Sequence, residues 1–107
     1  MTETRRKLDE MVRRIVERFR PDRVILFGSL ARGEETPDSD ADLLIVMRLD
    51  GPRRQTATAV DLALYGIDYP ADIIILTPDE LDEQSRIPGT IARSALREGE
   101  VLYARSA

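Results

Sequence analysis

Asp40 and Asp42 are two acidic residues at the start of an apolar run that reads as a buried β-strand ending at Met47. In an extended strand, residues two apart point to the same face, so these two carboxylates project together while Ala41 points away. Carboxylates held so close resist joint ionisation unless a divalent cation compensates their charge. The spacing therefore predicts metal ligands. Asp72 heads the next apolar run and can join them in a two-metal centre if that strand is a neighbour.

A glycine turn precedes these acids and resembles two phosphate-binding motifs without matching either. Gly28 and Gly33 have the glycine spacing of a P-loop, but Glu34 and Glu35 stand where Lys and Ser or Thr should follow, and acidic side chains would repel phosphate. The dinucleotide-binding fingerprint needs a third glycine at position 30, where this chain has leucine. The turn is therefore neither a P-loop nor a dinucleotide-binding loop, and any phosphate that it binds must be bound in another way.

The chain contains no histidine and no cysteine, which removes several classes of site. Histidine-dependent triads and zinc or iron sites with imidazole or thiolate ligands are excluded. Any metal must be bound by oxygen atoms, which favours magnesium, manganese or calcium. Asp38, Asp40 and Asp42 have the spacing that opens an EF-hand, but Leu43 and Leu49 occupy its glycine and glutamate positions. Calcium buffering is therefore not expected.

Composition indicates one globular domain over residues 1–107. Apolar residues make up 42% and charged residues 34% of the chain, as in ordinary folded domains. No apolar run reaches the roughly 20 residues that span a bilayer, and the first 20 residues lack the apolar core of a secretory signal. We therefore expect a cytoplasmic protein without membrane contact. The net charge of −4 argues against a nucleic acid as direct ligand.

Hydrophobic periodicity and turn signals predict an alternation of helices and strands. The expected fold class is mixed α/β (α+β), with a small mixed sheet of about four strands flanked by helices. The expected elements, in chain order, are a helix over 5–19, a strand over 23–27, a helical turn over 29–33, a strand over 40–47, a helix between a turn at 50–52 and a cap at Gly66, a strand over 71–76, a short helix opened by the Thr77–Glu80 capping box, a helix over 90–98 and a strand over 101–103.

The ordered set of motifs resembles the DNA polymerase β-like nucleotidyltransferase superfamily, and within it the minimal stand-alone members. The resemblance covers nearly the whole chain. It is carried by Gly28-Ser29, by Ala31-Arg32-Gly33, by the Ser39-Asp40-x-Asp42 element ten residues after the first, by the later Asp72, and by the Gly99-Glu100-Val101-Leu102-Tyr103 ending. It implies the nucleotidyltransferase fold, and nothing at the three carboxylates departs from an active member.

The resemblance also implies roles for these residues. Gly28 lets the backbone approach the triphosphate, and Ser29 offers its hydroxyl and N–H to a terminal phosphate. Asp40 and Asp42 hold the metal that carries the nucleotide phosphates. Asp72 helps to bind a second metal and orients or deprotonates the acceptor hydroxyl. Mg²⁺ is the expected ion, with Mn²⁺ as an alternative.

Several of these residues also have purely structural interpretations. Asp40 and Asp42 can be solvated acids before a strand, and Asp72 can simply begin one, with Asp68 as a rival acid four residues earlier. Arg32 is a candidate phosphate contact, but an ion pair with a loop acid explains it equally well. Ser39 is included with the nucleotide-binding set, although its position also suits a turn residue that supports the acids after it.

Minimal nucleotidyltransferases are commonly paired with a small helical HEPN protein as a toxin-antitoxin system. The resemblance thus implies an antitoxin that transfers AMP from ATP to a tyrosine hydroxyl of a HEPN toxin, within a homo- or hetero-oligomer. One alternative is a non-catalytic antitoxin that neutralises its partner by stoichiometric binding. Another is nucleotidylation of a small-molecule hydroxyl. The chain's own tyrosines are interpreted as packing residues rather than acceptors: Tyr65, Tyr69 and Tyr103.

Overall fold

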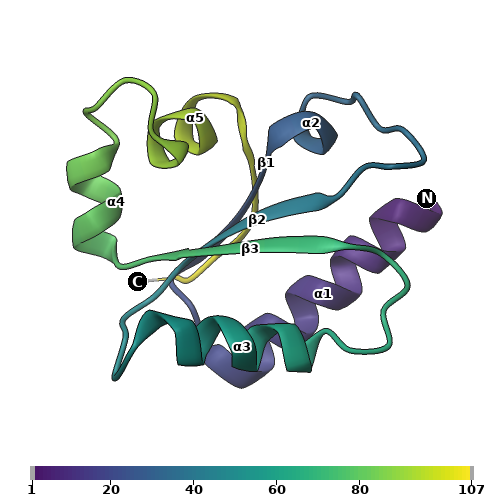
Figure 1. The fold of residues 1–107 in the computed structure, drawn as a ribbon, viewed down its shortest axis with the longest axis horizontal. Helices are drawn as coiled ribbons and strands as arrows, with labels where there is room; N and C mark the ends of the chain where they lie inside the picture. The colour runs from purple at the N-terminus through teal and green to yellow at the C-terminus, as the bar shows by residue number, and fades with distance from the viewer. Residues whose placement is uncertain (1, 107) are drawn as a thin grey trace.

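A four-stranded mixed sheet forms the centre of the protein, as seen in a computed structural model that describes residues 2–106 (Figure 1). The helices and strands are α1 (Glu3–Phe19), β1 (Arg23–Phe27), α2 (Gly28–Ala31), β2 (Ala41–Val46), α3 (Arg53–Ala63), β3 (Ala71–Leu76), α4 (Pro78–Gln84), α5 (Ile91–Glu98) and β4 (Glu100–Ala104). Their order and nearly all their positions match the sequence expectation. The mixed α/β fold class is therefore confirmed.

The strand order is β3-β2-β1-β4, so β1 and β2 are central and β3 and β4 are the edges. β1 pairs antiparallel with β2 and with β4, whereas β2 pairs parallel with β3. The parallel pair needs a crossover, which α3 supplies. Because of this crossover, β2 and β3 begin at the same end of the sheet, next to α2 (Figure 1).

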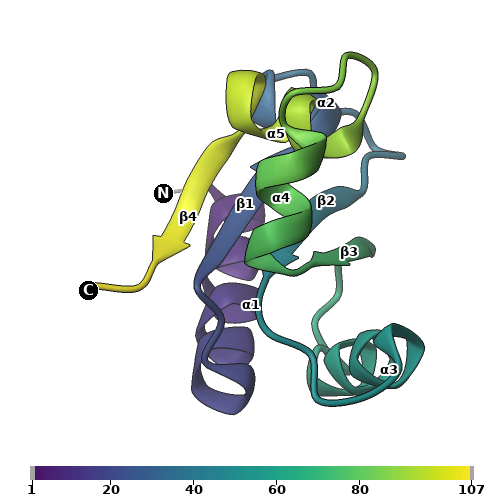
Figure 2. The ribbon, with the colours of Figure 1, turned by 90° about the vertical axis from the view of Figure 1, so that its left-hand side faces the viewer.

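Helices cover both faces of the sheet (Figure 2). α1 and α3 pack on one face, where the side chains of Leu43 and Ile45 are buried, and α4 and α5 pack on the other, where Leu44 and Val46 are buried. A strand between two helical layers has no solvent face, so a continuous apolar run is what it requires. The four buried residues named above all belong to β2, and the sequence expectation that this strand is buried on both faces is confirmed.

Local signals explain where the helices begin. α1 starts at Glu3 because the Thr2 hydroxyl accepts a hydrogen bond from the Arg5 N–H, two residues before the helix start expected from periodicity alone. α4 carries the expected capping box between Thr77 and Glu80. α3 ends earlier than expected, at Ala63, with Leu64 as its C-cap. No helix in residues 2–106 has the length and apolar character needed to cross a membrane.

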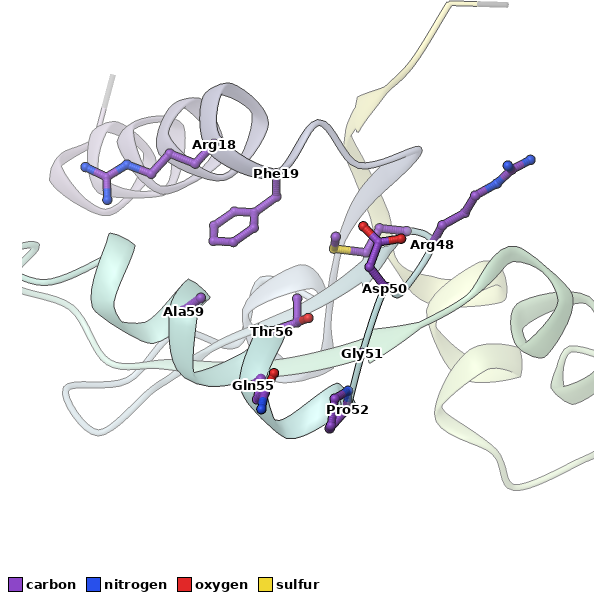
Figure 3. A pocket seen from close by; sticks show the side chains of 10 residues that line it. Arg18, Phe19, Arg48, Asp50, Gly51, Pro52, Gln55, Thr56 and Ala59 are labelled. Carbon is purple, nitrogen blue, oxygen red and sulfur yellow. The ribbon is translucent and has the colours of Figure 1, made fainter.

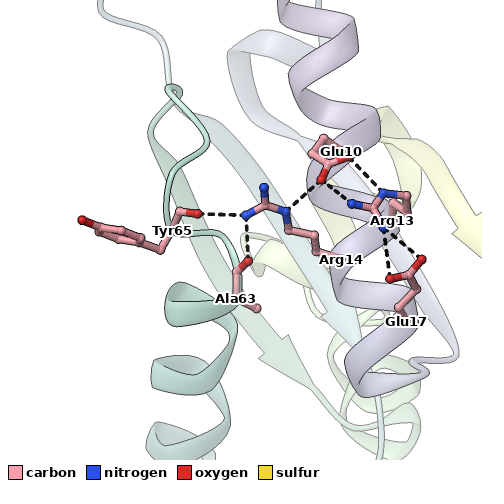
Figure 4. A network of polar contacts seen from close by, with 6 residues as sticks. All are labelled: Glu10, Arg13, Arg14, Glu17, Ala63 and Tyr65. Atoms are coloured by element: carbon pink, nitrogen blue, oxygen red, sulfur yellow. Dashed lines mark hydrogen bonds and ion pairs between the residues drawn. The ribbon is translucent and has the colours of Figure 1, made fainter.

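Arg14 joins α1 to the end of α3 (Figure 4). Its guanidinium donates to the carbonyl oxygens of Ala63 and Tyr65 at 3.2 and 2.8 Å, and to Glu10 at 2.9 Å. These carbonyls are at the end of α3, where no further turn of helix satisfies them. The Tyr65 side chain itself is 84% exposed, so its interpretation as a packing residue is wrong.

We expect Arg14→Ala to lower the free energy of unfolding by about 1–2 kcal/mol, because it removes a part-buried hydrogen bond to the Ala63 carbonyl and an exposed one to the Tyr65 carbonyl. Arg13→Ala is the matched control, since Arg13 is exposed and its ion pairs within residues 2–106 are with Glu10 and Glu17 of its own helix. Its expected cost is below about 0.5 kcal/mol. Urea unfolding of both variants measures the difference. Equal costs would contradict a bridging role for Arg14.

Candidate functional site

The sheet register brings two of the three candidate carboxylates side by side. Asp42 of β2 pairs with Asp72 of β3, and Phe27, the last residue of β1, pairs with Asp42 from the other side. Neighbouring strands lie about 4.8 Å apart, and paired residues point to the same face. The condition set by the sequence, that Asp72 must lie on a neighbouring strand, is met.

Asp40 lies outside the strand that was expected to contain it. β2 begins at Ala41, whose N–H donates to the Pro70 carbonyl at 2.9 Å and whose Cα pairs first with Ala71. Residues 32–40 have no partner strand, so the ladder cannot extend to Asp40. The expectation that strand geometry alone aims Asp40 and Asp42 together is therefore corrected: the preceding loop sets the direction of Asp40.

Asp42 is half-buried among like charges. Burial raises the pKa of the Asp42 carboxyl above its usual range, and the negative charges of Asp72 and Asp40 raise it further, with Arg32 acting in the opposite direction. Carboxylates held this close repel one another when all of them are ionised. A bound cation would relieve this repulsion, which is the electrostatic signature expected of metal ligands.

Gly28 lies directly against the Asp42 carboxylate. Its φ of +75° is in the left-handed region, and a Cβ placed on it would be 2.2 Å from Oδ2 of Asp42. Only glycine meets both conditions, because any side chain would clash with the carboxylate and strain the backbone. Besides the close approach to phosphate that the resemblance implied, this glycine thus leaves room for a carboxylate.

Ser29 follows in the first turn of α2 and is half-buried. Its carbonyl accepts from the N–H groups of Arg32 and Glu34 at 3.1 and 2.9 Å, which closes the turn. Among the hydrogen bonds of residues 2–106, none involves the Ser29 hydroxyl. This hydroxyl is therefore available beside Gly28.

The structure gives Arg32 and Ser39 structural contacts. Arg32 pairs with Glu34 at 3.2 Å and with Glu98 of α5 at 3.9 Å, as in its ion-pair interpretation. The Ser39 hydroxyl accepts from the Thr36 N–H at 2.7 Å, and the Ser39 N–H donates to the Thr36 carbonyl at 3.0 Å. Ser39 thus closes a turn that ends directly before Asp40.

The chain matches a known protein family over most of its length. The model of the family described as "Nucleotidyltransferase domain" matches residues 8–102. The chain belongs to this nucleotidyltransferase family. The resemblance drawn from its motifs is confirmed at this level.

Individual relatives of this nucleotidyltransferase agree with the family. It is 38% identical over 86 residues to a Methanocaldococcus jannaschii protein named "Putative protein adenylyltransferase MJ0604", covering 80% of this chain and 82% of that protein. A solved structure described as a "putative minimal nucleotidyltransferase" is 32% identical, with a TM-score of 0.61 and 92% of each chain covered. A "putative nucleotidyltransferase" from Sulfolobus solfataricus, 23% identical, shares the fold with a TM-score of 0.65 over 94% of this chain and 79% of that one.

The donor atoms of this nucleotidyltransferase suit a hard divalent cation. Its candidate ligands are all carboxylate oxygens, which Mg²⁺ and Mn²⁺ prefer. Within residues 2–106, no three acidic side chains converge closely enough to enclose a cation by themselves. That arrangement is compatible with Mg²⁺, which proteins usually hold with one or two carboxylates while substrate phosphates and water complete its shell.

The sequence does not predict two hydrogen bonds that Glu35 accepts in the loop before Asp40. The sequence indicates Glu35 as an acid that would repel phosphate and as a loop acid able to pair with Arg32, whereas in the structure its carboxylate accepts hydrogen bonds from the hydroxyls of Thr4 and Tyr69. Tyr69 was interpreted as a packing residue, which is confirmed by its contact with the core, but its hydroxyl also takes part in this polar group. The partners are 31 and 34 residues away, so no local pattern could reveal them.

A cavity of about 420 Å³ opens at the far end of β2 from the carboxylates (Figure 3). Phe19, Met47 and Thr56 are among its lining residues. The two arginines at its edge, Arg18 and Arg48, extend away from each other in Figure 3. Its charged lining residues, Arg18, Arg48 and Asp50, include none of the predicted site residues, so the candidate active site remains at the end of the sheet where β2 and β3 begin.

Proposed function

We propose that this nucleotidyltransferase is a protein adenylyltransferase that transfers AMP from ATP to a tyrosine hydroxyl of a HEPN-type toxin, and so acts as its antitoxin. The observation that carries the proposal is the pairing of Asp42 with Asp72 directly beside Gly28 and Ser29. The name of its Methanocaldococcus jannaschii relative supports a protein acceptor.

Each residue has a defined task in this reaction. Asp40, Asp42 and Asp72 would hold Mg²⁺ or Mn²⁺, which neutralises phosphate charge and polarises the α-phosphate when bound. The Ser29 hydroxyl and N–H bind a terminal phosphate oxygen. Because Gly28 has no Cβ, its backbone can lie directly against the Asp42 carboxylate, which leaves this group free to face the nucleotide.

Asp72 is the group placed to act on the acceptor. It is exposed at the start of an edge strand, where a tyrosine of another molecule can approach. The acceptor oxygen forms a bond to the α-phosphorus, and the bond from that phosphorus to the bridging oxygen of the β-phosphate breaks. Pyrophosphate leaves, and the proton of the hydroxyl passes to the Asp72 carboxylate and then to solvent.

The test is to incubate the chain with Mg²⁺, ATP labelled at the α-phosphate and the HEPN protein encoded beside it. We expect label on a tyrosine of the HEPN protein, loss of labelling with a chelator, and its return on addition of Mg²⁺ or Mn²⁺. Absence of label where the two proteins form a complex would contradict the proposal. Replacement of both Asp40 and Asp42 by Asn should also abolish neutralisation of the toxin. If the double variant neutralises fully at low dose, stoichiometric binding is the mechanism.

A further inference from the structure

The carboxylate of Glu35 joins three separate segments of the chain. Its Oε2 atom accepts a hydrogen bond from the Thr4 hydroxyl of α1 at 2.5 Å and another from the Tyr69 hydroxyl at 3.2 Å. Glu35 itself is in the loop over residues 32–40, and Tyr69 is in the loop that leads into β3. We call these three residues the Glu35 clasp. The clasp connects the loop that ends at Asp40 to α1 and to the loop that leads into β3.

Tyr69 is a firm support for this contact. Its ring packs against the core on the α1 and α3 face of the sheet. The next residue, Pro70, accepts the hydrogen bond from the Ala41 N–H at 2.9 Å that opens the pairing of β2 with β3. Burial raises the pKa of the Tyr69 hydroxyl, and its bond to Glu35 and the nearby charges of Glu35 and Asp40 add to this. The hydroxyl therefore remains a donor at neutral pH.

The rest of the loop has few attachments of its own. The Glu34 N–H is bonded to the Ser29 carbonyl at one end, and the Thr36–Ser39 turn stands at the other. Residues 32–38 are all exposed, so no apolar packing fixes the stretch between these ends. Apart from the ion pair of Arg32 with Glu98 at 3.9 Å at the start of the loop, the clasp is the side-chain contact within residues 2–106 that attaches this stretch to other elements, because Thr4 and Tyr69 both lie outside the loop.

The position of Asp40 depends on this loop. Asp40 stands one residue before β2, so the sheet does not set the direction of its carboxylate. We infer that Glu35 is a positioning residue, which uses Thr4 and Tyr69 to hold the loop so that the Asp40 carboxylate faces the same cation as Asp42. This inference rests on the proposed function for its cation.

Tyr69→Phe is the decisive variant, since it removes one hydrogen bond of the clasp without changing the net charge or the ring that packs on the core. We expect amide hydrogens of residues 34–40 to exchange about 3- to 10-fold faster than in the unaltered chain, as loss of one net hydrogen bond implies. We expect Mn²⁺, titrated by electron paramagnetic resonance, to bind about 3- to 10-fold more weakly. Glu35→Ala, which removes both bonds, should have the larger effect on exchange.

Two controls separate positioning from general damage. Tyr65→Phe removes a hydroxyl from a side chain that is 84% exposed, and should leave both exchange and Mn²⁺ binding unchanged. The Glu35→Ala and Tyr69→Phe double variant should exchange no faster than Glu35→Ala alone, because the two changes remove one shared contact. In transfer assays, the metal concentration at half-maximal rate should rise in Tyr69→Phe while the rate at saturating metal stays within about twofold.

The outcomes distinguish this inference from the proposed function. Unchanged exchange at residues 34–40 in both clasp variants would overturn the clasp itself. Faster exchange with unaltered Mn²⁺ binding would overturn its role in positioning Asp40. Failure of the unaltered chain to bind Mn²⁺ would contradict the proposed function, and the exchange data would still decide whether the clasp holds the loop.

Discussion

Asp42→Asn is expected to reduce AMP transfer by roughly 10³-fold, equivalent to roughly 4 kcal/mol of transition-state stabilisation. The variant keeps the shape of the side chain against Gly28 but removes the charge with which Asp42, paired with Asp72 across the strands, would hold the proposed cation. Transfer is measured with ATP labelled at the α-phosphate. The control is Asp68→Asn, which changes an exposed acid of the loop before β3 and should leave the rate within about twofold.

Loss of activity in this variant should not be accompanied by loss of stability. The pKa of Asp42 is raised above its ordinary value of 3.8 by burial and by two neighbouring carboxylates. A raised pKa in the folded state means that Asp42 contributes stability at low pH, and that this contribution is lost as pH rises through its folded pKa. In the metal-free chain, Asp42→Asn should therefore match the unaltered protein in acid and become relatively more stable as pH rises above 3.8. Thermal unfolding without metal measures this, and a variant less stable at neutral pH would contradict the assigned repulsion.

The sequence predicted the position of Asp42 and Asp72 well because both belong to strands. The runs after these residues are continuously apolar, which predicts buried neighbouring strands, and an α-helical crossover makes such strands parallel. Residues at the heads of parallel neighbours then meet at one end of the sheet, as the observed register shows. This reasoning needs only local patterns and general topology.

The rest of the site depends on contacts that local patterns do not contain. Asp40 was assigned to the strand, but strand pairing begins one residue later, where the Pro70 carbonyl is available. Arg32 pairs with Glu98, which lies 66 positions further along the chain and becomes a neighbour only when α5 packs beside α2. Glu35 owes its role to Thr4 and Tyr69 for the same reason. Loop acids are thus where sequence patterns are least informative.

Gly28→Ala is expected to damage both the fold and the activity. The new methyl group would be 2.2 Å from the Asp42 carboxylate, and φ is +75° at this position. Backbone strain and overpacking together should lower the free energy of unfolding by about 2–4 kcal/mol, which corresponds to roughly 10–20 °C in Tm. Asp42 must also move to relieve the contact, so transfer should fall at least about 10²-fold. Calorimetry and the labelled-ATP assay measure the two effects.

Gly89→Ala is the matched control, because Gly89 also has a positive φ but has open space where its Cβ would lie. Its φ is +86°, and a methyl group at this position would meet no heavy atom of another segment within 4 Å. It should cost about 1–2 kcal/mol from strain alone and leave transfer intact. The excess cost of Gly28→Ala then measures the contact with Asp42.

Combining Gly28→Ala with Asp42→Ala should recover much of that excess, since truncation of Asp42 removes the clashing oxygen. If the two changes are instead additive, the glycine is required only for its backbone conformation, and the close approach of Asp42 does not explain it.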